Sequence, residues 1–178
     1  MTLPGHMLDF IATRDHRLMR RVHRWRPPRW FRLWMTYATR GGDGWLWYGY
    51  SALVMILGGP ERYAVLAAAW TACGAGALLF LILKKLTGRK RPNALVPHCW
   101  ATLLPPDQFS FPSGHTITAF AFTVCVSSFY PHLLGVLVFC ALSVAASRIV
   151  LGMHFLSDVV VGAVMGASLG YAGFLIFA

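Results

Sequence analysis

The chain has 178 residues, of which 57% are hydrophobic and 12% are charged, and its formal net charge at pH 7 is +10. Soluble domains ordinarily carry about 25% charged residues, and the long uncharged stretches of this chain exceed what one core of this size requires, so the sequence predicts an integral membrane protein. The 17 Gly and 10 Pro show no period and only four Cys are present, which excludes collagen-like, disordered and disulfide-scaffold proteins.

The first 43 residues are predicted to form an amphipathic, basic segment. Its apolar residues follow at spacings of 7, 4 and 3 and share one helical face, namely Ile11, Leu18, Val22 and Trp25. Arginines occupy the rest of the circumference, and Pro27 and Pro28 end the helix before a second amphipathic stretch. We expect this helix to lie in the membrane interface with its arginines toward lipid phosphate. The alternatives are a basic face packed on the protein's own loops and a mitochondrial presequence.

Windows without charged residues predict five transmembrane helices within residues 44–178. The windows are 44–60, 63–83, two spans within 108–147 that Pro131-His132 divides, and 159–178. Each is close to the ~20 residues that cross a hydrocarbon core. The predicted fold class is therefore all-α: an integral membrane helical bundle of about five transmembrane helices, preceded by the amphipathic N-terminal segment 1–43.

Five spans place the amino terminus, the loop at 84–112 and the junction at 148–158 on the same side of the membrane. Of the 16 Lys and Arg residues, 15 share that side, which the positive-inside rule assigns to the cytoplasm. With this hydropathy the basic charge indicates lipid headgroups or phosphate as partners, and no nucleic acid, because no nucleic-acid-binding module is present. The sequence leaves the oligomeric state open.

The candidate site consists of three clusters on the basic side: residues 84–92, residues 112–115, and residues 147–148 together with 154 and 158. Lys84, Arg91 and Arg148 are cations with few acids near them in sequence, and a phosphoryl group held by arginine forks is their natural counter-ion. Ser113 and Gly114 open a predicted helix, where free backbone N–H groups and the helix dipole also favour an anion. These clusters together predict a phosphate-binding site.

Two histidines indicate phosphoryl transfer. His154 and Asp158 are four residues apart, so on a helix the carboxylate would hold one imidazole nitrogen and leave the other free as a nucleophile. His115 supplies a second imidazole, able to act as general acid and base. Taken singly, these signals also fit a local polar pair, a helix cap and, for Lys85, Arg89 and Lys90, simple headgroup anchors.

The order and spacing of these residues resemble the type 2 phosphatidic acid phosphatase superfamily, which also contains bacterial acid phosphatases and vanadium haloperoxidases. The family pattern is Lys-x6-Arg-Pro, then Pro-Ser-Gly-His, then Ser-Arg-x5-His-x3-Asp. This chain fills every position with Lys84, Arg91-Pro92, Pro112-Ser113-Gly114-His115, Ser147-Arg148, His154 and Asp158. The motifs cover about residues 80–165.

The resemblance implies a membrane-embedded, metal-independent lipid phosphate phosphatase without a cofactor. In this scheme His154 would attack phosphorus, Asp158 would orient it, and His115 would protonate the leaving oxygen and then activate water. The remaining residues would hold the phosphoryl oxygens: Lys84, Arg91, Ser113, Gly114 and Arg148. The sequence itself offers no metal-ligand cluster.

The resemblance leaves the substrate open among undecaprenyl diphosphate, phosphatidic acid, phosphatidylglycerophosphate and a polyprenyl-phosphosugar phosphate. A non-catalytic lipid-phosphate-binding or transport protein of the same fold is the alternative function. Compared with the commoner six-span members, this chain lacks a first transmembrane helix. Bacterial lipid phosphatases of the family usually face the periplasm, whereas the charge count favours the cytoplasm. We therefore expect a multi-pass bacterial inner-membrane protein and leave open which side of the membrane its active site faces. Labelling of Cys99 with an impermeant reagent would test this. Loop aromatics are candidate substrate gates: Trp100, Phe109 and Phe111.

Overall fold

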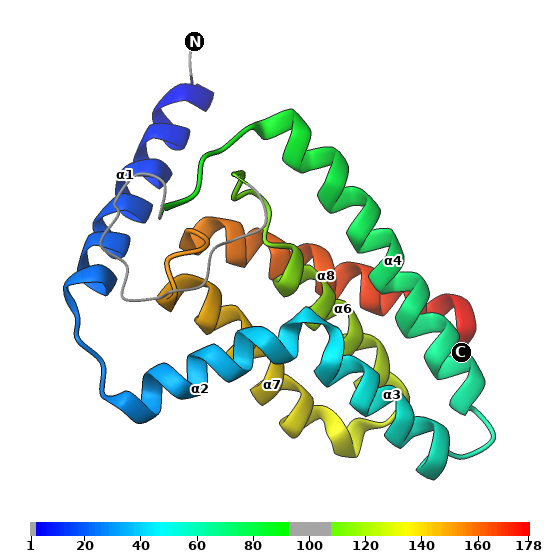
Figure 1. The fold of residues 1–178 in the computed structure, drawn as a ribbon. Coiled ribbons are helices and arrows are strands. Elements are labelled where there is room, and N and C mark those ends of the chain that lie inside the picture. Colours follow the sequence, from blue (N-terminus) through cyan, green and yellow to red (C-terminus); the bar gives the residue numbers. More distant parts are fainter. Residues whose placement is uncertain (1–2, 93–107) are drawn as a thin grey trace.

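The computed structural model describes residues 3–92 and 108–178, and the regular elements in these two ranges are helices (Figure 1). In chain order the α-helices are α1 (Leu3–Arg24), α2 (Arg29–Arg40), α3 (Leu46–Leu57), α4 (Arg62–Thr87), α6 (Gly114–Phe129), α7 (Leu134–Val150) and α8 (Leu156–Phe177). A π-helical turn, Gly41–Trp45, joins α2 to α3, and a 3-10 turn, Pro131–Leu133, precedes α7. The all-α fold is as predicted. The loop residues Cys99 and Trp100 lie outside the described ranges.

The centre of the bundle is the pair α6 and α8, with α4 on one side and α7 on the other (Figure 1). Glycines let the two central helices approach closely. A Cβ atom built on Gly166 would lie 2.3 Å from the Ile117 carbonyl oxygen, and one on Gly170 would lie 2.4 Å from that of Ala121. Such small-residue contacts are typical of helix pairs in membranes, where close backbone packing drives association.

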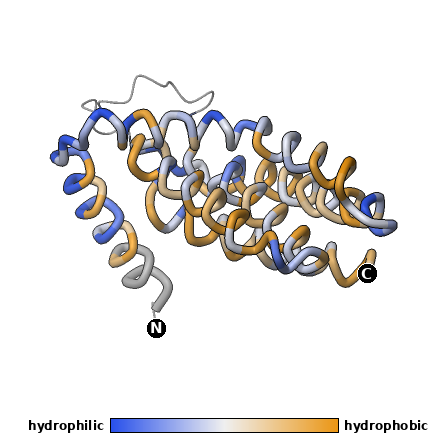
Figure 2. Tube along the Cα trace, turned by 90° about the horizontal axis from the view of Figure 1, so that it is seen from below, coloured by the Kyte–Doolittle hydropathy of each residue, from blue (hydrophilic) through white to orange (hydrophobic). Residues whose placement is uncertain are grey.

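Three of the predicted spans form helices that are long and apolar enough to cross a membrane: Arg62–Thr87, Pro131–Val150 and Leu156–Phe177. The helix α6 is apolar but shorter, with 16 residues, and α3 has only 12. The bundle is mostly apolar along its length, whereas polar residues gather in α1 and at helix ends (Figure 2). The protein is an integral membrane protein, and two of its five expected spans are shorter helices than the sequence windows suggest.

The N-terminal segment forms two helices that Pro27 and Pro28 separate, as expected. The helix α1 contacts α7 and α8, and α2 packs along α7 (Figure 1). The predicted apolar face of α1 is only partly covered, because Ile11 and Trp25 are exposed. The residues most buried on α1 are Met19 and Asp15. The buried carboxylate of Asp15 was not anticipated from the sequence.

The junction of α2 and α3 is a kink at Gly44, whose φ of 131° is a backbone conformation that only glycine adopts readily. The kink turns the chain into the bundle and shortens α3 relative to the predicted span. Asp43 lies at the same end of the bundle as the end of α4 and the start of α6. Asp43 and these two helix ends line one cavity. This end of the molecule carries the candidate site.

Candidate active site

The three predicted clusters meet at a cavity of about 390 Å³ at one end of the bundle. Six predicted site residues line it: Lys84, Arg91, Gly114, His115, Arg148 and His154. The other two, Ser113 and Asp158, are fully buried and lie outside the cavity wall. Aromatic side chains cover another part of the wall, namely Trp47, Tyr48, Trp70 and Phe80. The cavity therefore combines basic, imidazole and flat apolar surfaces.

The loop between α7 and α8 places His154. Gly152 has a φ of 69°, and the amides of Met153 and His154 both donate to the Arg148 carbonyl oxygen at 3.0 Å. The left-handed glycine turns the chain back over the end of α7, as it commonly does after a helix C-terminus. The His154 side chain is consequently fixed beside Arg148 and is only 2% exposed.

Hydrogen bonds assign different roles to the two nitrogens of the His154 imidazole. Nδ1 lies 2.6 Å from the Ser110 carbonyl oxygen, and because a carbonyl only accepts, Nδ1 carries the proton. Nε2 then has a free lone pair, and Arg91 Nη1 donates to it at 3.0 Å. The same guanidinium nitrogen donates to the Met153 carbonyl oxygen at 2.9 Å. The tautomer is therefore the one in which Nε2 is nucleophilic.

The surroundings of His154 keep its imidazole neutral. Its pKa is lowered from 6.5 to about 4, mainly by burial, with the cations Arg148 and Arg91 acting in the same direction and the Asp158 carboxylate opposing the shift. Desolvation penalises the charged imidazolium, and nearby positive charges act in the same direction. A neutral imidazole at physiological pH is the form that attacks an electrophile.

The position of Asp158 differs from the simple pair expected from the sequence. Its Oδ2 lies 3.8 Å from His154 Nδ1 and accepts a hydrogen bond from the Phe155 amide at 2.8 Å. Its Oδ1 accepts from Arg89 Nη1 at 2.5 Å. The direct partner of Nδ1 is thus the Ser110 carbonyl, and the carboxylate acts on the imidazole across a slightly longer distance. Arg89, expected to be at most a headgroup anchor, is bound to this carboxylate.

His115 has a carboxylate partner that the motifs do not contain. Its Nε2 lies 2.6 Å from Asp43 Oδ1, which comes from the π-helical turn. The backbone of Gly42 packs against the same ring, because a Cβ atom there would lie 3.3 Å from His115 Cδ2 and 2.8 Å from Val144. The Gly-Gly-Asp-Gly sequence at 41–44 therefore brings backbone and carboxylate against the imidazole.

The remaining predicted residues are anchored from several helices. Arg148 Nη1 donates to Thr39 Oγ1 of α2 at 2.5 Å, and Lys84 Nζ lies 4.6 Å from the centre of the Phe80 ring. Ser113 is the residue before α6, and its Oγ accepts from Thr116 Oγ1 at 2.9 Å. The first backbone N–H groups of α6 follow it, and Gly114 and His115 line the cavity. The arrangement suits an anion between the two imidazoles.

Several groups at the site were not found from the sequence. Ser110 acts through its backbone carbonyl, which no residue type reveals, and it reaches His154 because residues 89–91 and 108–110 pair antiparallel. Asp43 is marked in the sequence by the glycines around it, although its charge alone only borders a predicted span. Among the residues that the structure describes, no three His, Cys, Asp or Glu side chains gather as metal ligands. Of the gate candidates, Phe109 is partly exposed and Trp100 is not described.

Comparison with known proteins agrees with this architecture. A family model described as the PAP2 superfamily matches residues 62–178. A lipid A 1-phosphatase of Rhizobium johnstonii is 28% identical over 160 residues, which are 79% of this chain and 65% of that protein. A decaprenylphosphoryl-5-phosphoribose phosphatase of Mycobacterium tuberculosis is 34% identical over 105 residues, 57% of each chain. The matched part thus spans less than two thirds of the length of these curated relatives.

Two solved structures share the fold. The first transmembrane PAP2 type phosphatidylglycerolphosphate phosphatase from Bacillus subtilis superposes with a TM-score of 0.74 at 24% identity, covering 93% of this chain and 85% of that one. Aquifex aeolicus LpxE gives a TM-score of 0.74 at 27% identity, covering 89% of this chain and 93% of that one. The helical arrangement, including the N-terminal part, is therefore similar to that of transmembrane proteins of this kind.

Proposed function

The chain belongs to the PAP2 superfamily, and we propose that it is a membrane phosphatase that removes a phosphate from a lipid headgroup through a phosphohistidine on His154. The observation that carries the proposal is the His154 imidazole itself. Its Nδ1 proton is held by the Ser110 carbonyl, so its Nε2 lone pair faces Arg91. A phosphoryl group that enters between Nε2 and Arg91 would accept the hydrogen bond of the guanidinium in place of the lone pair.

In the first step Nε2 of His154 attacks phosphorus and the bond to the leaving oxygen breaks. His115 donates a proton to that oxygen, so the lipid leaves as an alcohol or, from a diphosphate, as a phosphate. Lys84, Arg91 and Arg148 neutralise the three equatorial oxygens, together with the N–H groups at the start of α6. The imidazolium that forms on His154 is stabilised by the Ser110 carbonyl and, at 3.8 Å, by Asp158.

In the second step water attacks the phosphorus of the phosphohistidine. His115, now neutral, takes a proton from that water, and the P–N bond breaks so that the electron pair returns to Nε2. Inorganic phosphate leaves and His154 is again neutral. The two imidazoles therefore have opposite roles, as a nucleophile that must be unprotonated and as an acid that must begin protonated.

The surroundings of the site favour a lipid carrying a sugar phosphate as the substrate. The cavity lies at the end of apolar helices, and its non-basic wall includes the flat rings of Tyr48, Trp70 and Phe80. Such rings offer apolar faces to a headgroup ring or an acyl chain. Two relatives are named for lipid A and for decaprenylphosphoryl-5-phosphoribose, and the latter is a polyprenyl-linked sugar phosphate. We place this headgroup class ahead of phosphatidic acid.

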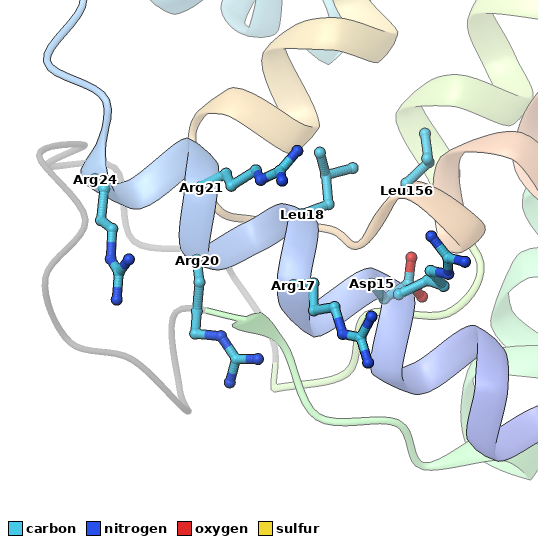
Figure 3. A pocket seen from close by; sticks show the side chains of 8 residues that line it. Asp15, Arg17, Leu18, Arg20, Arg21, Arg24 and Leu156 are labelled. Carbon is cyan, nitrogen blue, oxygen red and sulfur yellow. The ribbon is translucent and has the colours of Figure 1, made fainter.

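The basic face of α1 is proposed to bind the anionic membrane surface beside the site. Arg17, Arg20, Arg21 and Arg24 extend from α1 around a cavity of about 540 Å³ that Leu156 also lines (Figure 3). All four are exposed, and among the described residues none of them forms an ion pair. Because each arginine near an anionic surface gains about 1 kcal/mol, phospholipid headgroups are the natural counter-ions.

The experiment is phosphate release by the full chain in detergent with EDTA present. The substrates are a polyprenyl-phosphoribose phosphate, lipid A, phosphatidylglycerophosphate, phosphatidic acid, undecaprenyl diphosphate and a soluble phosphomonoester. We expect release that EDTA does not reduce and that His154→Ala abolishes, while His16→Ala on α1 retains it. The sugar-phosphate lipids should give the highest kcat/KM.

Three outcomes would overturn parts of this proposal. If the folded protein releases phosphate from none of the lipids, the function is that of a non-catalytic lipid-phosphate-binding or transport protein. Release that survives His154→Ala would contradict the phosphohistidine. A ranking led by phosphatidic acid would leave the chemistry in place and correct the headgroup.

A further inference from the structure

The N-terminal helix reaches the candidate site through one buried carboxylate. Asp15 of α1 is only 5% exposed although α1 is largely a surface helix. Its Oδ1 accepts from the Ser157 amide at 3.2 Å, and its Oδ2 accepts from Ser157 Oγ at 2.5 Å. Asp15 therefore satisfies a free N–H at the start of α8 from a different helix, three residues from His154 in sequence.

Arg89 joins this carboxylate to the one beside His154. Its Nη2 donates to Asp15 Oδ2 at 2.7 Å, and its Nη1 donates to Asp158 Oδ1 at 2.5 Å. Nη1 also donates to Ser157 Oγ at 2.7 Å, and the guanidinium lies 4.3 Å from the centre of the Phe155 ring. One planar fork thus bridges two carboxylates that are 143 residues apart in sequence, 158 minus 15.

The two carboxylates of this cluster are buried and share one partly exposed cation. Asp158 is fully buried and Asp15 nearly so, and in the described part of the chain the ion-pair partner of both is Arg89. A buried carboxylate is costly unless it is paired and hydrogen-bonded. Since Oδ1 of Asp158 is held by Arg89 and Oδ2 by the Phe155 amide, the carboxylate has a fixed orientation, with Oδ2 toward His154.

We propose that Arg89 and Asp15 are positioning residues of the phosphatase site, in which Arg89 fixes and partly neutralises the Asp158 carboxylate beside His154, and Asp15 limits that neutralisation by sharing Arg89. The proposal rests on the proposed function and adds the N-terminal helix to the site. Neither residue belongs to the three motifs. Neither lines the site cavity, so both act through Asp158.

The cluster makes opposite predictions for its two members. Without Arg89 the full charge of Asp158 faces His154 and favours the imidazolium, so the pKa of His154 rises from about 4. Without the charge of Asp15, Arg89 neutralises Asp158 more completely, so the pKa of His154 stays or falls. If the cluster only held α1 in place, either change would let water reach His154 and raise its pKa in both variants.

The groups that face His154 set the background for this effect. Three of them act on His154 directly: Arg91 from the segment after α4, Arg148 from α7 and Asp158 from α8. The others line the same cavity, namely Asp43 from the turn before α3, Lys84 from α4 and His115 from α6. None of these residues is altered in the experiment. The measured difference between variants therefore reports the charge of Asp158 as Arg89 and Asp15 modify it.

The test is an NMR titration of the full chain in detergent micelles with ring-labelled histidine. The chain has seven histidines, and His154 is assigned by the signal missing from His154→Gln. We compare Arg89→Gln, Arg89→Lys and Asp15→Asn, with the adjacent, exposed Lys90→Gln as the matched control. Phosphate release, as kcat and KM separately, is measured on the same samples with His154→Ala beside them.

We expect a higher His154 pKa in Arg89→Gln, a smaller rise in Arg89→Lys, no rise in Asp15→Asn and no change in Lys90→Gln. The kcat of Arg89→Gln should fall about tenfold or more with KM little changed. A rise in both Asp15→Asn and Arg89→Gln, or no rise in either, would overturn the inference. The titration does not need turnover. A wild type without phosphatase activity would contradict the proposed function, but the titration would still show whether Arg89 and Asp15 act on His154 through Asp158.

Discussion

The imidazole of His115 and the carboxylate of Asp43 are 72 residues apart in the chain and 2.6 Å apart in the structure. The contact depends on the π-helical turn that ends at Trp45 and on the absence of a side chain at Gly42. Because the Asp43 carboxylate accepts from Nε2, it orients the ring and favours a proton on it. The ring of the proposed acid is thus already oriented before the substrate binds.

Asp43→Asn should slow the reaction according to the leaving group. A lipid alkoxide needs the proton of His115, so we expect release from the lipid phosphate to fall roughly tenfold to a hundredfold, part of the 10²–10⁴-fold of general acid catalysis. From an aryl phosphate such as p-nitrophenyl phosphate, the phenolate leaves without a proton, so phosphate release from it should fall less than about threefold. Steady-state kinetics on both substrates make the comparison.

Two variants serve as controls for this effect. His115→Ala should slow both substrates, because His115 also activates the water of the second step, with the larger loss on the lipid. Glu61→Gln, an exposed acid at the start of α4, should change neither substrate. Equal losses on the lipid and on the aryl ester in Asp43→Asn would mean that Asp43 supports the fold of the site and does not act through the proton of His115.

The helices and the cavity residues were accessible from the sequence because their signals are local. A charge-free window predicts a span from composition alone, and α4, α7 and α8 form there as expected. The cations and histidines were accessible because phosphate chemistry requires particular side chains at fixed spacing. These residues meet at one cavity because successive spans run in opposite directions. The end of α4, the start of α6 and the end of α7 therefore lie at the same end of the bundle.

The rest depended on contacts between distant segments. The Ser110 carbonyl holds His154 Nδ1, and any residue at position 110 would present a carbonyl. Arg89 looked like one of several basic residues after α4, and only the packing of α1 shows that it bridges Asp15 and Asp158. The predicted span at 44–60 gave a shorter helix because Gly44 bends the chain before α3 and the extended Gly58 ends it. The periodicity of apolar residues does not indicate such a bend, and only the glycine itself signals it.

The low pKa of His154 should appear as a pH dependence of stability. Burial, Arg148 and Arg91 lower that pKa from 6.5 to about 4, so between these values the unfolded chain binds a proton at His154 and the folded chain does not. Stability therefore falls as the pH drops from 6.5 toward 4 and is retained above 6.5. Thermal unfolding in detergent should show a steeper acid loss for wild type than for His154→Gln.

His16→Gln provides the comparison for that measurement, because His16 is an exposed histidine of α1. Its acid loss should match that of the wild type. If His154→Gln loses stability as steeply as the wild type between pH 6.5 and 4, His154 is not held neutral by its surroundings, and the neutral nucleophile would lack support.

The arginine face of α1 should make activity depend on anionic lipid. In nanodiscs, we expect wild-type phosphate release to rise with the fraction of phosphatidylglycerol. The triple variant Arg17→Gln, Arg21→Gln, Arg24→Gln should flatten that dependence, because each arginine contributes about 1 kcal/mol near an anionic surface. Raising the salt concentration should flatten the wild-type curve in the same way, since the charges are exposed and screened.

A second triple variant with the same loss of charge locates the effect. It replaces the arginines that precede and begin α2, namely Arg26, Arg29 and Arg32. We expect it to retain more of the lipid dependence than the α1 variant does. Equal flattening by the two triples would indicate a general effect of net charge, and the α1 face would then have no special part in binding the membrane surface.

Gly166→Ala should destabilise the bundle and reduce activity together. The added Cβ would lie 2.3 Å from the Ile117 carbonyl oxygen and 3.0 Å from Phe120 Cβ, so the backbones of α6 and α8 must separate. Overpacking of this kind costs about 1–3 kcal/mol. Because α8 carries Asp158 and α6 begins at Gly114, their separation also displaces the two sides of the site. Thermal unfolding and phosphate release, measured in the same detergent, test both effects.

Gly74→Ala is the matched control, since it lies within α4 and a Cβ there meets nothing within 4 Å. Alanine is a better helix former than glycine by about 1 kcal/mol, so this variant should be as stable as the wild type or more so, with unchanged activity. If Gly166→Ala unfolds at the temperature of Gly74→Ala, the close approach of α6 and α8 does not hold the bundle together. If it unfolds earlier but turns over normally, the packing stabilises the helices without setting the distance between His115 and Asp158.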